Sequence, residues 1–143
     1  MYRPSPFGDV PVSCRLRQVT ADLSLAVALW KTEAMLVAFS VAPSGVPTAG
    51  PAPHDASVHD AVAAAVRVVR ESGLPNKTDA MFTTIEGEWD EVMDVVKRAT
   101  EAVGRYGSRV SLVLKADIRP GYYGELTGKV DRLEAAINER DQK

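Results

Sequence analysis

The residues best suited to chemistry in this sequence are a carboxylate and its neighbours near the middle of the chain. When ionised, Glu86 only accepts hydrogen bonds, so it suits a ligand that carries N–H groups or positive charge. Thr83 could add a hydroxyl group, and Phe82 beside it could add a flat apolar wall. Ser40 lies at the end of the first predicted strand, near the place where a sheet-borne pocket would open, and Asn76 precedes the second strand. These residues form the predicted binding site for a small molecule.

Each of these residues also has a purely structural explanation. Glu86 comes just before a predicted helix over residues 88–104, where the helix dipole and free amide groups stabilise a negative charge. Thr83 is a good strand former, Ser40 is an ordinary small strand residue, and Asn76 is typical of a turn. The residues alone leave both interpretations open.

An acid–base pair is the one catalytic arrangement that the residues suggest. Glu86 and Asp117 could form such a pair in a sheet-lined pocket, but no histidine base or activated nucleophile accompanies them. His54 and His59 lie five residues apart without a third metal ligand nearby, and the single cysteine, Cys14, rules out a disulfide within the chain. Glycine-rich phosphate loops and the Gly-x-Ser-x-Gly motif are absent from the sequence. We therefore expect no catalytic residues, no metal site and no cofactor.

Charge and hydropathy argue against a nucleic-acid-binding protein and against a membrane protein. The chain has 143 residues, of which 45% are hydrophobic and 25% charged, as in an ordinary globular domain. Its 17 Lys and Arg residues against 19 Asp and Glu residues give a net charge of −2, which offers no basic surface for nucleic acid. The most apolar N-terminal run, residues 23–30, is far shorter than the about 20 residues of a membrane span, and it makes a poor signal peptide. We expect a cytoplasmic protein without a membrane or nucleic-acid partner.

The chain divides near residue 35. Residues 1–34 contain closely spaced prolines and a glycine, followed by a segment with weak helical character. From residue 35 onwards, every segment predicts a clear element with a clear end. We therefore predict an N-terminal extension over 1–34, either flexible or a loosely docked helix, and one folded domain over 35–143.

Hydrophobic periodicity and turn signals predict the elements that must position the candidate residues. The prolines and glycines of residues 42–56 predict a loop that is neither helix nor interior strand. The region 77–87 contains either two short strands or one bent ribbon. The remaining elements are strands over 35–41 and 109–118 and helices over 57–72, 88–104 and about 125–138. This order, β-α-β-β-α-β with an added helix, predicts a ferredoxin-like α+β fold, an antiparallel sheet with helices on one face.

One face of the predicted sheet has no helix to cover it. In the strand over 109–118, apolar residues alternate with a second set that contains charges and Val113. An exposed sheet face that is not wholly polar commonly meets another subunit or a ligand. Lys115, Asp117 and Arg119 on this face could bind a ligand, but pairing with one another or across a subunit interface is the preferred interpretation. We predict self-association through the sheet, as a dimer or a tetramer.

Six short motifs follow one another along the predicted domain. They are Val41–Gly45, Ser72–Pro75, Thr83–Gly87, Trp89–Met93, Arg109–Ser111 and Lys115–Arg119. This ordered set resembles the thiamine-binding protein family, which belongs to the YkoF-like superfamily. The resemblance covers about residues 35–138 and depends on the order of the motifs, since none of them is specific alone.

The resemblance implies a ferredoxin-like subunit that assembles through its sheets and binds thiamine or its hydroxymethylpyrimidine moiety, with no known catalysis. Glu86 would then accept hydrogen bonds from the aminopyrimidine or balance the cationic thiazolium, and Thr83 matches the family motif. Phe82 is bulkier than the glycine expected at its position, and the loop over 44–56 is longer than in compact members. The expected function is that of a carrier, buffer or sensor. The alternatives are an interaction module without a ligand site, or a small enzyme that uses Glu86 and Asp117.

Overall fold

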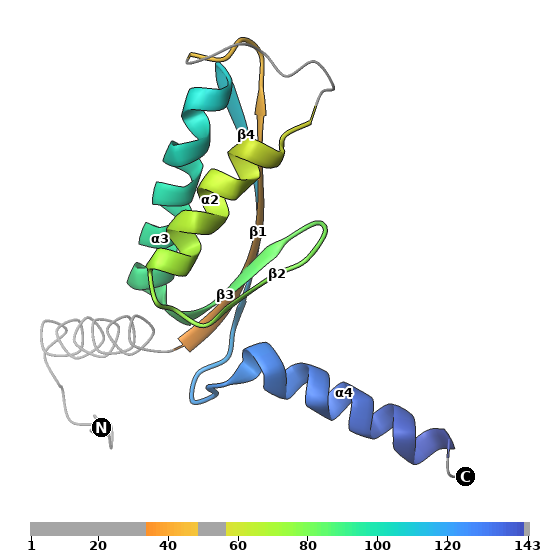
Figure 1. Cartoon of the computed structure of the whole chain (residues 1–143). Helices are drawn as coiled ribbons and strands as arrows, with labels where there is room; N and C mark the ends of the chain where they lie inside the picture. The colour runs from red at the N-terminus through yellow and green to blue at the C-terminus, as the bar shows by residue number, and fades with distance from the viewer. Residues whose placement is uncertain (1–33, 49–56, 142–143) are drawn as a thin grey trace, which may run out of the picture.

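The chain forms a four-stranded antiparallel sheet with two helices on one face, and a further helix projects from one end of the sheet (Figure 1). This computed structural model describes residues 34–48 and 57–141. The predicted N-terminal extension lies outside the described residues, apart from Ala34, which begins the first strand. The elements are β1 (Ala34–Ser44), α2 (His59–Glu71), β2 (Asn76–Thr78), β3 (Thr83–Glu88), α3 (Trp89–Val103), a 3-10 helix (Gly104–Tyr106), β4 (Arg109–Ile118) and α4 (Glu125–Asp141).

The topology confirms the ferredoxin-like prediction. The strands lie in the order β2–β3–β1–β4, and each neighbouring pair is antiparallel. Of the two arrangements predicted for residues 77–87, the structure has two short strands, which form a hairpin that starts at the pair Thr78 and Thr83.

β1 is longer than the sequence predicts. It pairs with β4 as far as Ser44, so the prediction that an irregular loop begins at residue 42 was wrong. β3 pairs with β1 only as far as Phe39, so the last part of β1 has a strand on one side alone. Pro43 is tolerated there because a proline, which lacks an N–H group, fits an edge position. The described structure therefore leaves one edge of residues 40–44 unpaired, beside the β2–β3 hairpin.

The core lies between the sheet and the helices α2 and α3. Alternate residues of β1 point into it, since the side chains of a strand alternate between its two faces. On both helices, small and branched residues meet this surface, which lets the helices pack closely against the sheet. The buried apolar residues include Met35, Val37, Phe39 and Val41 of β1, Ala61, Ala65 and Val69 of α2, Ile85 of β3, and Val92, Val95, Val96, Ala99 and Val103 of α3.

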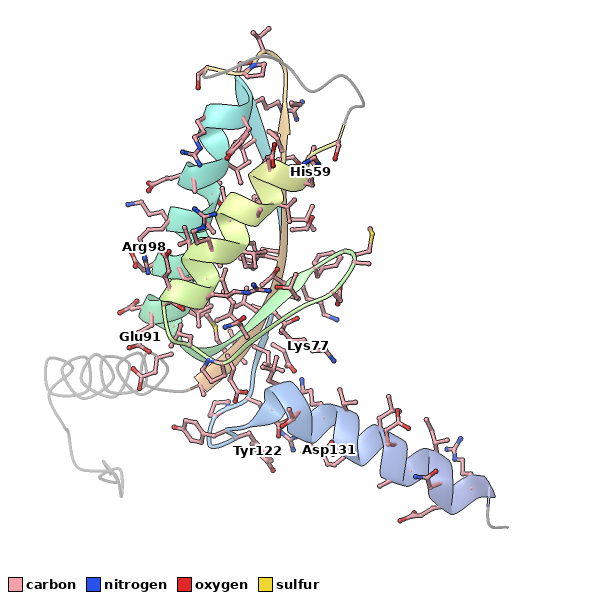
Figure 2. All side chains as sticks on the ribbon, in the orientation of Figure 1. His59, Lys77, Glu91, Arg98, Tyr122 and Asp131 are labelled. Atoms are coloured by element: carbon pink, nitrogen blue, oxygen red, sulfur yellow. The ribbon has the colours of Figure 1, made fainter. Side chains whose placement is uncertain are left out.

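The opposite face of the sheet is largely uncovered, as the alternation in residues 109–118 predicts. Val113 on this face is 55% exposed. The first turn of α4 lies on one end of the face, and the rest of the helix extends away from both layers, with Asp131 and its neighbours standing clear of them (Figure 2). Within residues 34–48 and 57–141, no helix has the length and apolar character needed to cross a bilayer.

Candidate functional site

A cavity of about 230 Å3 lies where β1 continues beyond its last pair with β3, which is Phe39 with Thr83. One wall is the first half of α2, where Val62 and Val66 are half-buried. The other wall is the β2–β3 hairpin, and the floor is the unpaired part of β1. We call this space the hairpin cavity. It is lined by Phe39, Ser40, Val41, Ala42, Val58, Val62, Ala65, Val66, Thr78, Asp79, Ala80, Met81, Phe82 and Thr83.

Asp79 shapes the hairpin that closes the cavity. Its Oδ1 accepts hydrogen bonds from the backbone N–H groups of Met81 and Phe82, both at 2.8 Å, and its own N–H donates to the Phe82 carbonyl at 2.9 Å. These bonds from Phe82 and Met81 lower the pKa of the Asp79 carboxyl, because they favour its charged form. A negative charge therefore sits at the rim of the cavity, and its second oxygen takes no part in the turn.

Two threonine hydroxyls lie between the strands of the hairpin. Thr78 Oγ1 and Thr83 Oγ1 are 3.1 Å apart and hydrogen-bonded. Thr83 is only 6% exposed, and its neighbour on the partner strand β1 is Phe39. The cavity thus combines apolar and aromatic walls with a few hydroxyl and carboxylate groups, as small-molecule sites do. Its volume is below the about 300–1,000 Å3 of sites for drug-sized ligands, so it suits a single flat ring.

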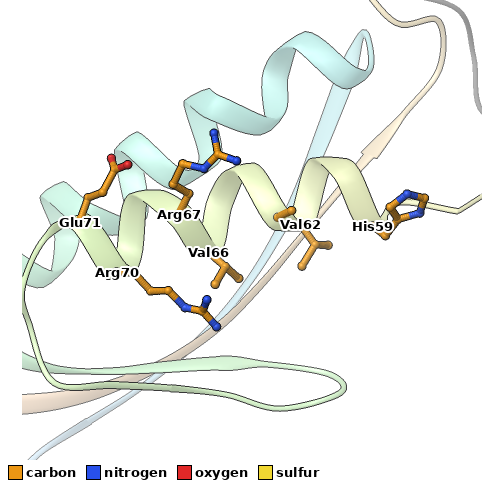
Figure 3. Close-up of a pocket in the computed structure, with 7 residues that line it drawn as sticks. His59, Val62, Val66, Arg67, Arg70 and Glu71 are labelled. Carbon is orange, nitrogen blue, oxygen red and sulfur yellow. The ribbon is translucent and has the colours of Figure 1, made fainter.

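A wider groove of about 630 Å3 runs along α2 and shares Val62 and Val66 with the hairpin cavity (Figure 3). All of its lining residues come from α2, so it is an open surface and not an enclosed site. Arg70 extends from α2 on the side of the hairpin, one helical turn beyond Val66 (Figure 3). The groove could hold a part of a ligand that projects from the cavity.

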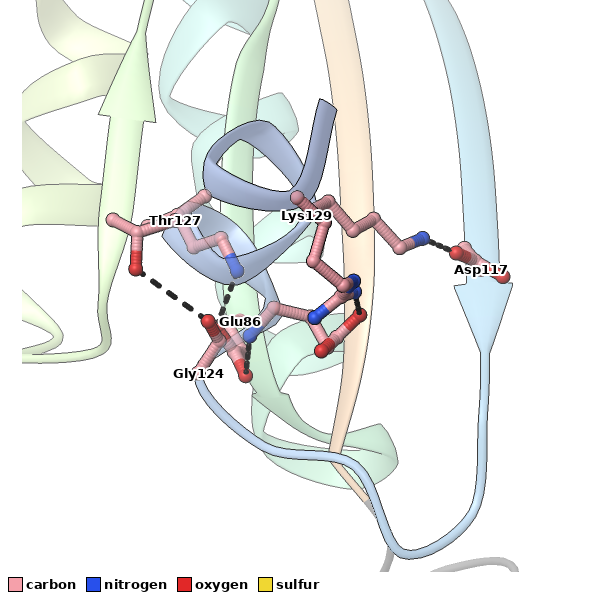
Figure 4. Close-up of polar contacts among 8 residues, drawn as sticks. Glu86, Asp117, Gly124, Thr127 and Lys129 are labelled. Carbon is pink, nitrogen blue, oxygen red and sulfur yellow. Dashed lines mark hydrogen bonds and ion pairs between the residues drawn. The ribbon is translucent and has the colours of Figure 1, made fainter. Parts of the chain in front are cut away.

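Glu86 lies on the other face of the sheet. Its Oε1 accepts a hydrogen bond from the N–H of Glu125 at 3.0 Å, and its Oε2 accepts one from the N–H of Leu126 at 2.9 Å (Figure 4). The carboxylate is 6% exposed and satisfies two of the free N–H groups at the start of α4. The sequence suggested that a helix terminus could explain Glu86, but that helix is α4 and not the one over 88–104, because α3 lies on the opposite face.

Further polar contacts hold the start of α4 to the sheet. Lys129 forms an ion pair with Asp117 of β4, and Arg132 donates to Glu125 Oε2 at 2.6 Å (Figure 4). The space left among these groups is about 10 Å3, which holds one water molecule at most. In this conformation the surroundings of Glu86 have hydrogen-bonding groups but no room for an organic ligand.

The structure divides the predicted site residues. Ser40, Phe82 and Thr83 all line the hairpin cavity. Ser40 lies in the floor formed by the unpaired stretch of β1, but its side chain points to the opposite face from those of Phe39 and Val41. Asn76 does not line this cavity, and its Nδ2 donates to the Leu74 carbonyl at 2.8 Å, a local turn contact. Glu86 is separated from the cavity by the sheet, because residues three apart on a strand point to opposite faces.

Sequence reasoning missed Asp79 and the contribution of α2. Asp79 lies between two predicted strands and is a typical turn residue, so its position was a signal for the hairpin that closes the cavity. The half-buried positions Val62 and Val66 carry no such signal, since they look like any other apolar positions of a helix. In the described parts of the chain, no three His, Cys, Asp or Glu side chains are arranged to hold a metal ion.

Sequence comparisons point to one family. A family model for the thiamine-binding protein matches residues 37–134. The UPF0045 protein Mb1933 of Mycobacterium bovis is 54% identical over 101 residues, which cover 70% of this chain and 91% of that protein. The UPF0045 protein sll0230 of Synechocystis is 38% identical over 79 residues, 54% of this chain and 65% of that protein.

Solved structures share the fold. Protein MJ1052 of Methanocaldococcus jannascii aligns with a TM-score of 0.60 at 28% identity and covers 71% of this chain and 97% of its own. TM0486 of Thermotoga maritima, described as a proposed thiamine biosynthesis/salvage protein, aligns with a TM-score of 0.57 at 25% identity over 70% of this chain and 98% of its own. A domain of unknown function from Bacillus cereus, DUF77, aligns with a TM-score of 0.54 at 32% identity over 65% and 85%.

Proposed function

Because the chain belongs to the thiamine-binding protein family, we propose that it binds thiamine or the hydroxymethylpyrimidine moiety of thiamine in the hairpin cavity. The observation that carries the proposal is that Phe82 and Thr83, both chosen from the sequence for ligand binding, line this one cavity, and that Ser40 lies in its floor. The description of the Thermotoga maritima neighbour as a thiamine biosynthesis/salvage protein supports the same class of ligand.

The chemistry of the cavity matches an aminopyrimidine. The flat ring lies against Phe82, and its exocyclic amine donates to the free oxygen of Asp79 or to the Thr83 hydroxyl. Alternate backbone groups along the unpaired edge of residues 40–44 offer further donors and acceptors. A cavity of about 230 Å3 takes the pyrimidine, and the thiazolium of intact thiamine lies in the groove along α2.

Binding without catalysis is part of the proposal, and it fits a carrier, a buffer or a sensor. The carboxylates of the enzyme alternative, Glu86 and Asp117, are both engaged in holding α4. A ligand could reach Glu86 only if the first turn of α4 moved away, so direct ligand binding by Glu86 stays a prediction.

The uncovered face of the sheet supports self-association as a further part of the proposal. Val113 is 55% exposed there, and it lies between Ser111 and Lys115 on the same face of β4. An exposed face of this mixed character is typical of a subunit interface. The number of copies and the cytoplasmic location stay predictions from the sequence.

Calorimetric titration of the full chain with hydroxymethylpyrimidine and with thiamine tests the ligand, and Thr83→Val tests the site. Valine keeps the shape of threonine, so the loss of one hydroxyl should weaken binding about tenfold. Thr84→Val is the matched control, since Thr84 points to the other face and should bind as the parent chain does. The absence of heat and of a melting shift with both ligands at millimolar concentration would overturn the proposal, as would equal effects of the two variants.

A further inference from the structure

The projecting part of α4 carries a stripe of exposed apolar side chains. Val130, Leu133 and Ile137 are 46%, 58% and 44% exposed, although they are large aliphatic residues. The helix leaves the sheet after its first turn, so no other described element covers the stripe (Figure 1). A surface of this kind on an ordered helix calls for a partner.

The spacing of the stripe indicates what kind of partner fits. Leu126, Val130, Leu133 and Ile137 are separated by four, three and four residues, the a/d spacing of a heptad repeat with Val130 and Ile137 at a. A helix that lies on a sheet or a core buries a broader face, which includes neighbouring e or g positions. Here the e positions hold Thr127 and Glu134 and the g positions hold Lys129 and Ala136, so no large apolar residue broadens the stripe. The stripe is therefore a narrow seam suited to another helix.

We propose that α4 pairs in parallel with α4 of a second copy of this chain, as a short two-stranded coiled coil. Branched residues at a together with leucine at d favour parallel dimers, and this seam has Val130 and Ile137 at a with Leu126 and Leu133 at d. This interface is separate from the uncovered sheet face and from the hairpin cavity.

The charges beside the seam favour the same orientation. In a parallel pair, the g positions of one helix lie beside the e positions of the other. Lys129 is at g and Glu134 is at e, so Glu134 of one copy lies near Lys129 of its partner. An antiparallel pair would bring the acidic e flanks together, with Glu134 of each copy on the same side. Lys129 also pairs with Asp117 of its own chain, so the parallel pair is favoured mainly because it keeps the two Glu134 side chains apart.

The first turn of α4 is held on the sheet, which makes so short a coiled coil feasible. Isolated helices of this length are marginal in water. The carboxylate of Glu86 caps the first turn, and the Lys129–Asp117 and Arg132–Glu125 contacts hold it on the sheet and brace it. Because the start of the helix is ordered before association, less conformational freedom is lost when two copies meet.

Replacement of one seam residue tests the interface. Leu133→Glu places a charge in the seam, whereas Ala135→Glu places the same charge on the outer face of the same helix. Both positions are exposed, so both variants should fold. In sedimentation equilibrium on the full chain, Leu133→Glu should raise the dissociation constant of one association step at least tenfold, and Ala135→Glu should not. A monomeric parent chain, or identical association by the two variants, would overturn the proposal.

A cross-link tests the orientation. Ile137→Cys in a Cys14→Ser background leaves one thiol in each chain, and in the parallel pair the two copies of residue 137 face each other within disulfide reach. Mild oxidation should then give a covalent dimer, while Asn138→Cys in the same background should cross-link far less. Without selective cross-linking at residue 137 the parallel arrangement is wrong.

Disruption of association by Val113→Glu but not by Leu133→Glu would instead assign association to the sheet face alone. Leu133→Glu should keep the ligand affinity of the parent, so a failure here is distinct from a failure of ligand binding.

Discussion

The two faces of β3 lead to two different uses of polar side chains. Thr83 points toward the helices and lines a cavity of about 230 Å3, while Glu86 points to the other face, where only about 10 Å3 remains beside it. Glu86 has the stronger hydrogen-bonding group, but both of its oxygens are taken by the N–H groups of α4. The comparison teaches that polar chemistry marks a ligand site only where packing also leaves space.

The largest expected effect is the release of α4 when Glu86 is replaced by alanine. Two hydrogen bonds from backbone amides to a buried charge are lost, so the opening of the helix root should become easier by about 2–4 kcal/mol. Hydrogen exchange of the amides of Glu125 and Leu126 measures this change. Glu88→Ala is the matched control, because Glu88 shares the strand and the face but makes no side-chain cap to α3.

This variant also tests the division between the two faces. Affinity for hydroxymethylpyrimidine should stay within about twofold of the parent, a difference of less than 0.5 kcal/mol. If binding is lost while the α4 amides stay protected, Glu86 belongs to the ligand site and the division is incorrect.

An intermediate effect is expected from Asp79 on the cavity side. Asp79→Ala removes the acceptor of two turn bonds, so the hairpin should loosen and ligand affinity should fall about tenfold. Titration calorimetry measures the affinity. Lys77→Ala, an exposed change on the same hairpin, serves as the control, and unchanged affinity in Asp79→Ala would remove this carboxylate from the site.

The same carboxylate predicts a pH dependence. The pKa of Asp79 is lowered in the folded chain, so its contribution to stability is present above the ordinary value of 3.8 and is lost as the pH falls through the lower folded value. Exchange of the Met81 and Phe82 amides, corrected for the intrinsic rate, should therefore accelerate only in acid. Asp79→Asn should show no such step, and a step of equal size in that variant would assign it to another group.

The smallest effect is expected from the ion pair at the root of α4. Lys129→Met should change stability by less than about 1 kcal/mol, because the Lys129 and Asp117 side chains are 39% and 48% exposed and water screens their attraction. Thermal unfolding measures the change. A loss as large as that in Glu86→Ala would show that the ion pair, and not the cap, holds the helix.

Much of the fold could be predicted because its signals are local. The alternation in residues 109–118 and the punctuation by Gly and Pro are properties of short segments, and the order of elements follows from them. The end of β1 was missed because its pairing with β4 to Ser44 joins segments far apart in the sequence. Pro43 looked like a loop residue, and only the missing neighbour on the β3 side makes it acceptable in a strand.

The site could be predicted in part for the same reason. Phe82 and Thr83 are adjacent, and the strand pairing brings Ser40 near them, so one cavity collects all three. The partner of Glu86 could not be foreseen, because Glu125 is 39 residues further along the chain and its position depends on where α4 meets the sheet.

By itself, the sequence determined the order of the elements and the face to which each strand residue points. The spacing of Thr83 and Glu86 already separates them, since strand side chains alternate with a period of two. Only the tertiary structure decided which of the two faces keeps open space. That space remains after α2, the hairpin and the unpaired edge of β1 have packed together. Because these segments are far apart in the sequence, the pattern of residues within each one does not predict how they pack.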